Sequence, residues 1–292
     1  MSKWIVIISL TLFSLNCRQA NGKELTRVSM DSIADTVGFR ANGSLRLLAT
    51  RGFEFTISDG SKTQKVVGKG FDKKDIIKCK FSANRERIVA ITGPIRNLLF
   101  TSPLNISYKY HLSAPQGDRE TVVVFTDSLL QLDISQCQSV RNLLCREYQL
   151  TELDVTHNPD LEQLDCSENR LRTLDMSQNR NLQVLFCSKN QLKDIDVIHN
   201  QKLRELVCFD NENLSLDVSA NRNLEFLSCD GLLQELDVTN NIELRTLICR
   251  CKLTALDLSQ NKKLRKLLIS GNNFSAEELN AVFKTLPVVD YY

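Results

Sequence analysis

The sequence predicts a mainly β fold, a solenoid of short turns, and three observations support this prediction. A cysteine recurs at steps of 21 and later 20 residues along the second half of the chain, and an aspartate recurs in phase with it. Each period also contains strand-like alternation, as in Leu-x-Cys and Leu-Asp-Val, and a turn of about 21 residues leaves little room for a helix. We therefore expect two short strands per turn, stacked in register. The recurring positions are Cys145, Cys166, Cys187, Cys208, Cys229 and Cys249, followed by Ile269, and Asp133, Asp154, Asp175, Asp196, Asp217, Asp237 and Asp257.

The bulk composition is that of a folded protein. Of the 292 residues, 42% are hydrophobic and 25% are charged, which is enough for one sizeable core or for a small domain plus a larger one. The 37 basic and 35 acidic residues give a net charge of +2. A nearly neutral chain has no global field that would attract nucleic acid or an anionic membrane, so we expect no nucleic-acid partner.

Residues 1–17 have the features of a secretory signal peptide. Lys3 supplies the charged start, and the apolar run from Trp4 to Leu15 is too short to span a bilayer as a helix. Cys17 resembles the cleavage site of a bacterial lipoprotein, where the cysteine becomes the lipidated first residue. Cleavage near Ala20 without lipidation is the alternative. The sequence therefore predicts export, with membrane attachment only through a lipid on Cys17.

Residues 18–89 lack the repeat and predict a β-rich N-terminal region. Alternating apolar residues lead to Asp59-Gly60, a dipeptide typical of hairpin turns. The repeat begins near residue 90, because Val124 lies 21 residues before Cys145 and the sequence of residues 95–100 is similar to that of 140–145. The leucine-containing solenoid is therefore expected over residues 90–272.

Residues 273–292 predict a C-terminal cap that contains a short helix. Ser275 and Glu278 have the spacing of a capping box, in which each side chain binds the backbone amide of the other residue. The helix would cover the apolar edge of the last turn, which a solenoid must shield from water. Its apolar residues at helical spacing are Leu279, Val282, Phe283 and Leu286.

The cysteines could form disulfides, bind a metal or pack as small apolar side chains. Neighbouring turns present their cysteines with parallel Cα–Cβ directions, whereas a disulfide requires these directions to converge. Zinc requires a tetrahedral set of ligands, which a column with one thiol per turn does not offer. We therefore expect a reduced ladder of buried thiols and no metal site. Cys251 breaks the pattern, and an exposed reactive thiol or a partly buried loop thiol are both compatible with its position.

The aspartate column could hold calcium, but the sequence favours a structural role. Calcium requires about six to eight oxygen ligands, and the glycine-rich motif of calcium-binding β-rolls is missing. In most turns a serine or threonine lies two residues after the aspartate, where its amide or hydroxyl can donate to the carboxylate. Asparagine ladders should likewise satisfy backbone groups at the corners. They comprise Asn158, Asn179, Asn200, Asn221, Asn241 and Asn261, with Asn169, Asn190 and Asn211 in the other half of the turn.

We find no pattern of catalytic residues and expect neither an enzyme nor a cofactor. The histidines are His111, His157 and His199, and the last two lie two turns apart. A separation of about 10 Å is too large for a shared metal, and no serine or cysteine nucleophile lies beside them in register. Phosphate-binding glycine loops and zinc-helix motifs are missing as well.

A candidate partner-binding face lies on the strand that ends at each cysteine. The residues flanking the inward leucine point to the opposite side of the strand. In the middle turns these positions are apolar, with three phenylalanines expected to be exposed, and charges surround them as in many protein-binding surfaces. Strand propensity, or cover from the N-terminal segment, is the alternative explanation. The predicted binding residues are Val184, Phe186, Val207, Phe209, Phe226 and Ile248.

The repeat Leu-x-x-Leu-x-Cys-Ser-x-Asn-x-Leu-x-x-Leu-Asp-Val-Ser-x-Asn resembles the cysteine-ladder leucine-rich repeats of internalin J-like proteins and of surface lipoproteins in the Bacteroidetes. Residues 271–287 resemble the end segment of those arrays, and the match covers about residues 95–288. The resemblance implies a leucine-rich-repeat solenoid that binds a host or envelope protein, as a secreted or outer-membrane, cell-surface lipoprotein. A glycan-capturing protein or a periplasmic scaffold of an envelope complex is the alternative function.

Overall fold

In the structure, a computed structural model, the described residues are a set of separate strands before residue 129 and then 129–135, 137–212, 215–285 and 290–291. The chain forms two compact units, Met1–Val140 and Arg141–Tyr292. Cys17, with its predicted lipid, and His111 lie outside the described residues.

The first unit contains two groups of paired strands and is β-rich, as predicted. One group has the order β1 (Lys3–Ile5), β2 (Thr36–Asn42), β7 (Val89–Thr92), β4 (Glu54–Ser58) and β5 (Thr63–Val67), and β10 (Leu129–Asp133) also pairs with β2. The other group has the order β8 (Asn97–Thr101), β9 (Thr121–Phe125), β3 (Leu45–Ala49) and β6 (Ile77–Cys79). These pairs are antiparallel, except that β8 and β9 are parallel.

Two sequence predictions concern pairs in this unit. Strands β4 and β5 pair with Ser58 opposite Thr63, which confirms a hairpin across Asp59-Gly60. Strands β8 and β9 pair with Phe100 opposite Val124, which is the stacking expected of turns upstream of the cysteines. The parallel register of the repeat is therefore already present in these two strands.

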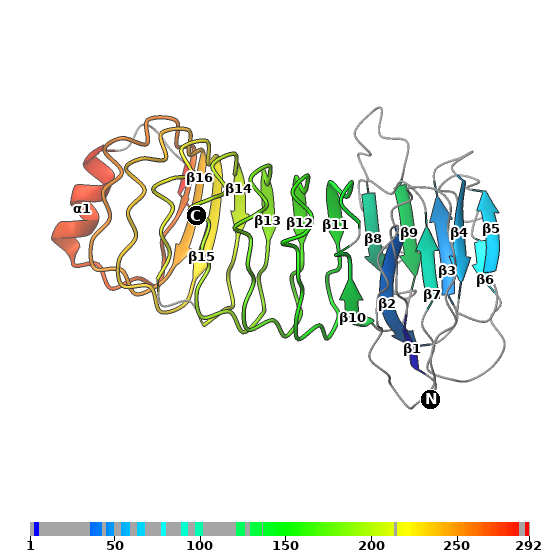
Figure 1. Cartoon of the computed structure of the whole chain (residues 1–292). Coiled ribbons are helices and arrows are strands. Elements are labelled where there is room, and N and C mark those ends of the chain that lie inside the picture. The colour runs from blue at the N-terminus through cyan, green and yellow to red at the C-terminus, as the bar shows by residue number, and fades with distance from the viewer. Residues whose placement is uncertain are drawn as a thin grey trace. The chain divides into compact units, whose positions relative to one another are not determined.

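The second unit is a parallel solenoid in which each turn contributes one strand (Figure 1). Successive strands pair in register, so the central leucine of each, from Leu143 to Leu267, lies opposite the next. The predicted solenoid with turns of about 21 residues is confirmed. Its strands are β11 (Asn142–Leu144), β12 (Gln163–Asp165), β13 (Val184–Phe186), β14 (Glu205–Val207), β15 (Phe226–Asp230), β16 (Thr246–Arg250) and β17 (Lys266–Leu268).

The expectation of two strands per turn is wrong. Within the described part of this unit, the Leu-Asp-Val half of the turns forms only one isolated bridge, between Asp194 and Ser215. The chain bends immediately after this half, because the amide of Asn158 donates to the carbonyl of Val155 at 3.0 Å, and later turns repeat the bond. The backbone groups that a second ladder would use are therefore taken by turns.

The core of the second unit consists of columns of equivalent apolar side chains. In one turn Leu182, Leu185, Cys187 and Leu192 all have 0% exposure, and the neighbouring turns repeat this set. Burial of apolar surface contributes about 25 cal/mol per Å², so these columns are the main source of stability.

Asparagines satisfy the backbone inside the corners, as predicted. Asn179 donates from Nδ2 to the carbonyls of Val155 and Asn158, both at 2.8 Å. The equivalent asparagines from Asn200 to Asn261 repeat both bonds to the preceding turns. Each asparagine thus ties one turn to the turn before it.

The aspartates have the predicted structural role. The carboxylate of Asp175 accepts a hydrogen bond from the amide of Ser177 at 2.9 Å. Every aspartate of the column, from Asp133 to Asp257, accepts the same bond from the amide two residues later. This bond lowers the pKa of Asp175, because it stabilises the charged form.

Helix α1 (Ala276–Thr285) lies at the end of the coil (Figure 1). The amide of Glu278 donates to Ser275 Oγ at 3.2 Å and the amide of Ser275 donates to Glu278 Oε2 at 2.8 Å, so the capping box is confirmed. Val282 is buried as predicted, but Phe283 is 38% exposed, because it lies one position further around the helix and leaves the covered stripe. Strand β18 (Asp290–Tyr291) then pairs with β17. Among the described residues, no helix has the length and hydropathy needed to cross a membrane.

Candidate functional site

A column of apolar side chains follows the outward side of strands β13–β16. The register places Phe186 beside Val207, Val207 beside Ser228, and Ser228 beside Ile248. The central leucines of the same strands, such as Leu206, are completely buried, so the column lies on the opposite side of the strands. Phe186, Val207 and Ile248 are half-buried.

A second column runs beside the first. Val184 pairs with Glu205 and Glu205 with Phe226, so a carboxylate separates the two apolar side chains. Phe209 follows the end of β14 and belongs to neither column. All three apolar residues are half-buried. The structure thus brings five predicted residues together and places Phe209 at the end of a strand.

The three phenylalanines are less exposed than expected. Phe186, Phe209 and Phe226 are each half-buried. Neighbouring strands lie about 4.8 Å apart, so side chains in register cover the sides of each ring and leave its outer part to solvent. The face that we name the strand face, made of the six predicted residues, is therefore a flat surface with partly exposed apolar groups.

Charged residues line the edge where the strands begin. Glu225 forms ion pairs with Arg204 at 2.6 Å and with Arg245 at 3.4 Å, and these pairs join three successive turns. The hydrogen bond from Arg204 lowers the pKa of Glu225. A hollow of about 380 Å³ lies at this edge, lined by Gln183, Lys202, Arg204, Asn223, Glu225 and Glu243.

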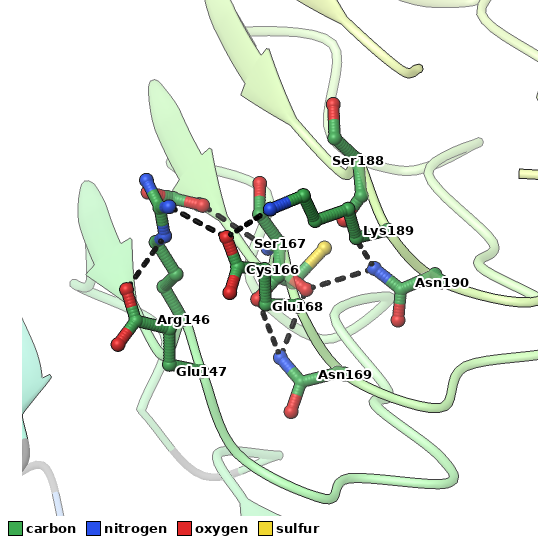
Figure 2. Close-up of polar contacts among 10 residues, drawn as sticks. Arg146, Glu147, Cys166, Ser167, Glu168, Asn169, Ser188, Lys189 and Asn190 are labelled. Carbon is green, nitrogen blue, oxygen red and sulfur yellow. Dashed lines mark hydrogen bonds and ion pairs between the residues drawn. The ribbon is translucent and has the colours of Figure 1, made fainter. Parts of the chain in front are cut away.

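A second charged edge lies where the strands end (Figure 2). Glu168 lies between two cations, with Oε1 at 2.7 Å from Arg146 Nη2 and 3.0 Å from Lys189 Nζ. Burial alone would raise the pKa of Glu168, but the hydrogen bonds from Lys189 and Arg146 outweigh it, so the pKa is lowered. The strand face therefore has a charged edge at both ends of its strands.

The corner residues after these strands have an unusual backbone. Left-handed φ angles of 65°, 57°, 53° and 53° occur at Glu147, Glu168, Lys189 and Asp210, each two residues after a column cysteine. This conformation costs an L-residue roughly 1–2 kcal/mol. The next turn has Gly231 at this position, with φ of 103°, and the turn after it has Cys251, which is not among the positive-φ residues. The corner therefore changes between Asp210 and Cys251.

The described thiols are free and buried, as the ladder hypothesis expects. Burial raises the pKa of the column thiols Cys145, Cys166, Cys187 and Cys208. Such thiols resist deprotonation and are poor nucleophiles. This part of the column is structural.

Cys251 is more buried than expected, with 1% exposure. Its Sγ lies 3.1 Å from that of Cys249, and the sulfurs of Cys229, Cys249 and Cys251 all lie within 4.8 Å of one another. The expectation of one thiol per turn is wrong here, because the turn of Cys249 directs a second cysteine inward. Hydrogen bonds from Cys229 and Cys249 lower the pKa of Cys251, and hydrogen bonds with Cys249 and Cys251 raise the pKa of Cys229.

The histidines lie on the surface. His157 Nδ1 is 3.2 Å from Thr156 Oγ1 and 3.6 Å from Asp154 Oδ2, which brings together the residue types of a hydrolytic triad. The hydroxyl of Thr156, however, donates to Asp154 at 2.6 Å, so the aspartate binds the hydroxyl directly. The geometry is that of a surface turn, and His199 is exposed in the same column two turns later.

Comparison with solved structures finds bacterial leucine-rich-repeat proteins. A leucine-rich-repeat protein of Leptospira interrogans has 25% sequence identity and a TM-score of 0.52, over 55% of this chain and 44% of that chain. The functional domain of internalin J from Listeria monocytogenes, which includes a cysteine ladder, has 27% identity and a TM-score of 0.44, over 56% of this chain and 44% of that one. Internalin C2 of the same organism has 18% identity and a TM-score of 0.47, over 54% of this chain and 74% of that one.

The match covers less than half the length of the first two proteins. No protein-family model matches the chain, and no curated protein matches it by sequence. The resemblance to internalins and cysteine-ladder proteins is confirmed for the fold, which is a leucine-rich-repeat solenoid.

Proposed function

We propose that this chain is an exported leucine-rich-repeat recognition protein that binds another protein through its strand face. The observation that carries the proposal is the column of Phe186, Val207 and Ile248, which are partly exposed side by side on a rigid parallel ladder. An apolar centre of this kind supplies most of the binding energy in protein interfaces.

The two charged edges support the same proposal. The pairs Arg204–Glu225 and Arg146–Glu168 lie at opposite ends of the strands and surround the apolar centre with polar groups. Charges at the rim orient a partner more than they add affinity. Because the strands are held in register by their neighbours, binding requires little ordering of the face.

We also propose export and a lipid anchor. The support is the charged start and apolar run of residues 1–17, followed by Cys17. The ligand would then be a host protein or a protein of the bacterial envelope. This proposal concerns the place of action and is independent of the strand face.

A glycan ligand is the second candidate, and the hollow at the first charged edge favours it. Its lining includes the amides of Gln183 and Asn223 and the charges of Arg204 and Glu225, which suit sugar hydroxyls. None of its lining residues is an aromatic that could stack on a sugar ring. For this reason we rank a protein ligand first.

The double variant Phe186→Ser, Phe209→Ser tests the strand face. The immobilised full chain is used to capture proteins from host-cell and envelope extracts, and the captured proteins are identified and quantified. We expect capture to fall at least about tenfold, because truncating central aromatic contacts typically costs 2 kcal/mol or more. The melting temperature should fall by only a few degrees, because both rings are half-buried.

Ile242→Ser is the matched control, because Ile242 is 52% exposed and lies outside the strands. It should leave capture unchanged. Equal losses in both variants, or unfolding of the double variant, would contradict the strand face. Glycan-array binding that is abolished by Arg204→Ala but not by the double variant would support the second candidate instead.

The export proposal has its own test. Intact cells are treated with protease or antibody, and the Cys17→Ala variant is compared with the unaltered chain. We expect the unaltered chain to be accessible and to sediment with membranes, and the variant to be released. A chain that stays protected inside the cell would contradict export.

A further inference from the structure

One part of the solenoid differs because its repeat is one residue shorter. From Cys145 to Cys229 the column cysteines are 21 residues apart, whereas Cys249 follows Cys229 after 20, and Ile269 follows Cys249 after 20. In both short turns the missing residue lies between the cysteine and the aspartate of the same turn, since the cysteine-to-aspartate step falls from nine residues to eight. The shortening is therefore at the corner after the strand.

Hydrogen bonds show which residue replaces which. In a regular turn the amide of Gln191 donates to the carbonyl of Leu171, and in the short turn the amide of Lys252 makes the equivalent bond to Leu233. One residue earlier, Cys251 therefore occupies the place of Asn190.

Asn190 occupies a buried place against the cysteine column. Its Nδ2 donates to the carbonyls of Cys166 and Cys187, both at 3.0 Å (Figure 2). In the turn before Cys251 the equivalent residue is Gly231, which has no side chain and leaves room for a sulfur. A cysteine at this place is thus directed toward the column and not toward solvent.

The result is a group of three sulfurs that no other part of the described chain repeats. Among the described residues, Cys229, Cys249 and Cys251 are the one group of three potential ligands whose donor atoms converge. Their side chains are 1%, 0% and 1% exposed. Sulfurs bound to one metal ion at about 2.3 Å are about 4 Å apart, which lies between the closest separation here, 3.1 Å, and the outer limit of 4.8 Å.

We propose that Cys229, Cys249 and Cys251 form a three-sulfur site for a soft monovalent cation, Cu(I). Sulfur ligands select Cu(I), Zn²⁺ and iron–sulfur clusters among the common metals. Structural zinc requires a tetrahedral set of four ligands, and iron–sulfur clusters use four cysteines. Three sulfurs in a site that excludes water suit the low coordination number of Cu(I).

The protonation of the cluster favours a cation. Hydrogen bonds from the thiols of Cys229 and Cys249 lower the pKa of Cys251, so the three sulfurs share one thiolate. Bound Cu(I) takes the place of the protons in these hydrogen bonds and releases them to solvent. Neither the metal nor the sulfurs change oxidation state, so no oxidant or reductant is required.

The reduced full chain is titrated with Cu(I) against bicinchoninate, a coloured Cu(I) chelator, without oxygen. We expect one tightly held Cu(I) per chain, and X-ray absorption with three sulfur neighbours at about 2.3 Å. Cys251→Ser should weaken this binding by about 100-fold, because it removes one of three ligands. Cys187→Ser is the matched control, since it removes a buried thiol from a turn that has only one, and it should keep the affinity.

A second variant keeps all ten cysteines of the chain. Insertion of one asparagine after Cys251 restores a 21-residue turn, with the asparagine in the buried place and Cys251 at the left-handed corner. It should lose the tight Cu(I) site while keeping the circular dichroism and melting temperature of a folded solenoid.

Three results would overturn the proposal. One is equal Cu(I) affinity in the unaltered chain and in both the Cys251→Ser and insertion variants. Another is Zn²⁺ that displaces Cu(I) from the site. The third is a Cys249–Cys251 disulfide in chain purified without oxidant, which would make the group a redox pair. None of these results affects the strand face, so the two proposals fail independently.

Discussion

The turns of Cys145 to Cys208 and the two turns of Cys229 and Cys249 share one repeat but satisfy their corners differently. In the regular turns a three-residue strand is followed by a left-handed corner, such as Lys189, and by a buried asparagine. In the short turns, strands β15 and β16 have five residues each, and neither a left-handed charged corner nor the asparagine follows.

The difference teaches what the asparagine is for. In the short turns the register continues through Cys229 opposite Cys249 and Asp230 opposite Arg250, so strand pairing satisfies backbone groups that the asparagine serves elsewhere. The side chain at this corner is then free of its structural role. A cysteine can occupy the place without leaving a buried carbonyl unpaired.

The largest expected effect is that of Asn190→Ala in a regular turn. The variant removes donors from the carbonyls of Cys166 and Cys187 and an acceptor from the amide of Leu171, all buried. At roughly 1–3 kcal/mol per unsatisfied group, partly relieved by relaxation, the free energy of unfolding should fall by about 3 kcal/mol. Urea unfolding of the purified chain measures it.

Cys251→Ala makes the same comparison in a short turn. Strand pairing already serves the backbone there, so we expect a loss of only about 1 kcal/mol, mainly from the missing sulfur. A loss as large as that of Asn190→Ala would mean that the two corners are stabilised in the same way.

The next effect is on thiol reactivity. Lys189→Cys places a thiol at the exposed left-handed corner of a regular turn, whereas Cys251 is 1% exposed. In the folded variant, iodoacetamide should modify the introduced thiol at least about 100 times faster than Cys251, which reacts only after local opening. Peptide mass mapping against time measures both rates.

Lys252→Cys is the control for position along the chain. Lys252 is exposed and directly follows Cys251, so the new thiol should also react quickly. If Cys251 itself reacts as fast as either introduced thiol, its corner is open to solvent and the difference between the two kinds of turn does not exist.

The repeat could be predicted from the sequence because every turn restates it. The leucine and cysteine positions follow from the 21-residue period, and the bonds of Asp175 and Asn179 follow from side chains that can reach nearby backbone groups. The second strand per turn was wrongly predicted, because alternation in Leu-Asp-Val is also compatible with a turn that begins immediately afterwards.

The thiol cluster could not be predicted from the column alone. Placing Cys251 required the change of step from 21 to 20 to be assigned to one corner, which the hydrogen bond from Lys252 to Leu233 provides. The exposure of Phe186 and Phe209 also depends on neighbouring strands, because alternation gives the direction of a side chain but not how much of it its neighbours cover.

The smallest expected effect concerns a bond that both kinds of turn share. The amide of Ser177 donates to Asp175 in a regular turn and that of Ser259 donates to Asp257 in a short one, and each bond lowers the pKa of its aspartate. A lowered folded-state pKa gives stability that is present above the unfolded pKa of about 3.9 and is lost as the pH falls through the lower folded value.

Asp175→Asn and Asp257→Asn keep the acceptor oxygen but cannot titrate. Between pH 5 and pH 2 the melting temperature of each variant should therefore fall less than that of the unaltered chain, by about 1 °C. The two variants should agree, because the shortened corner lies in the other half of the turn from these aspartates. Differential scanning calorimetry across this pH range measures the effect, and a clearly larger change for Asp257→Asn would mean that the deletion alters the whole turn and not one corner.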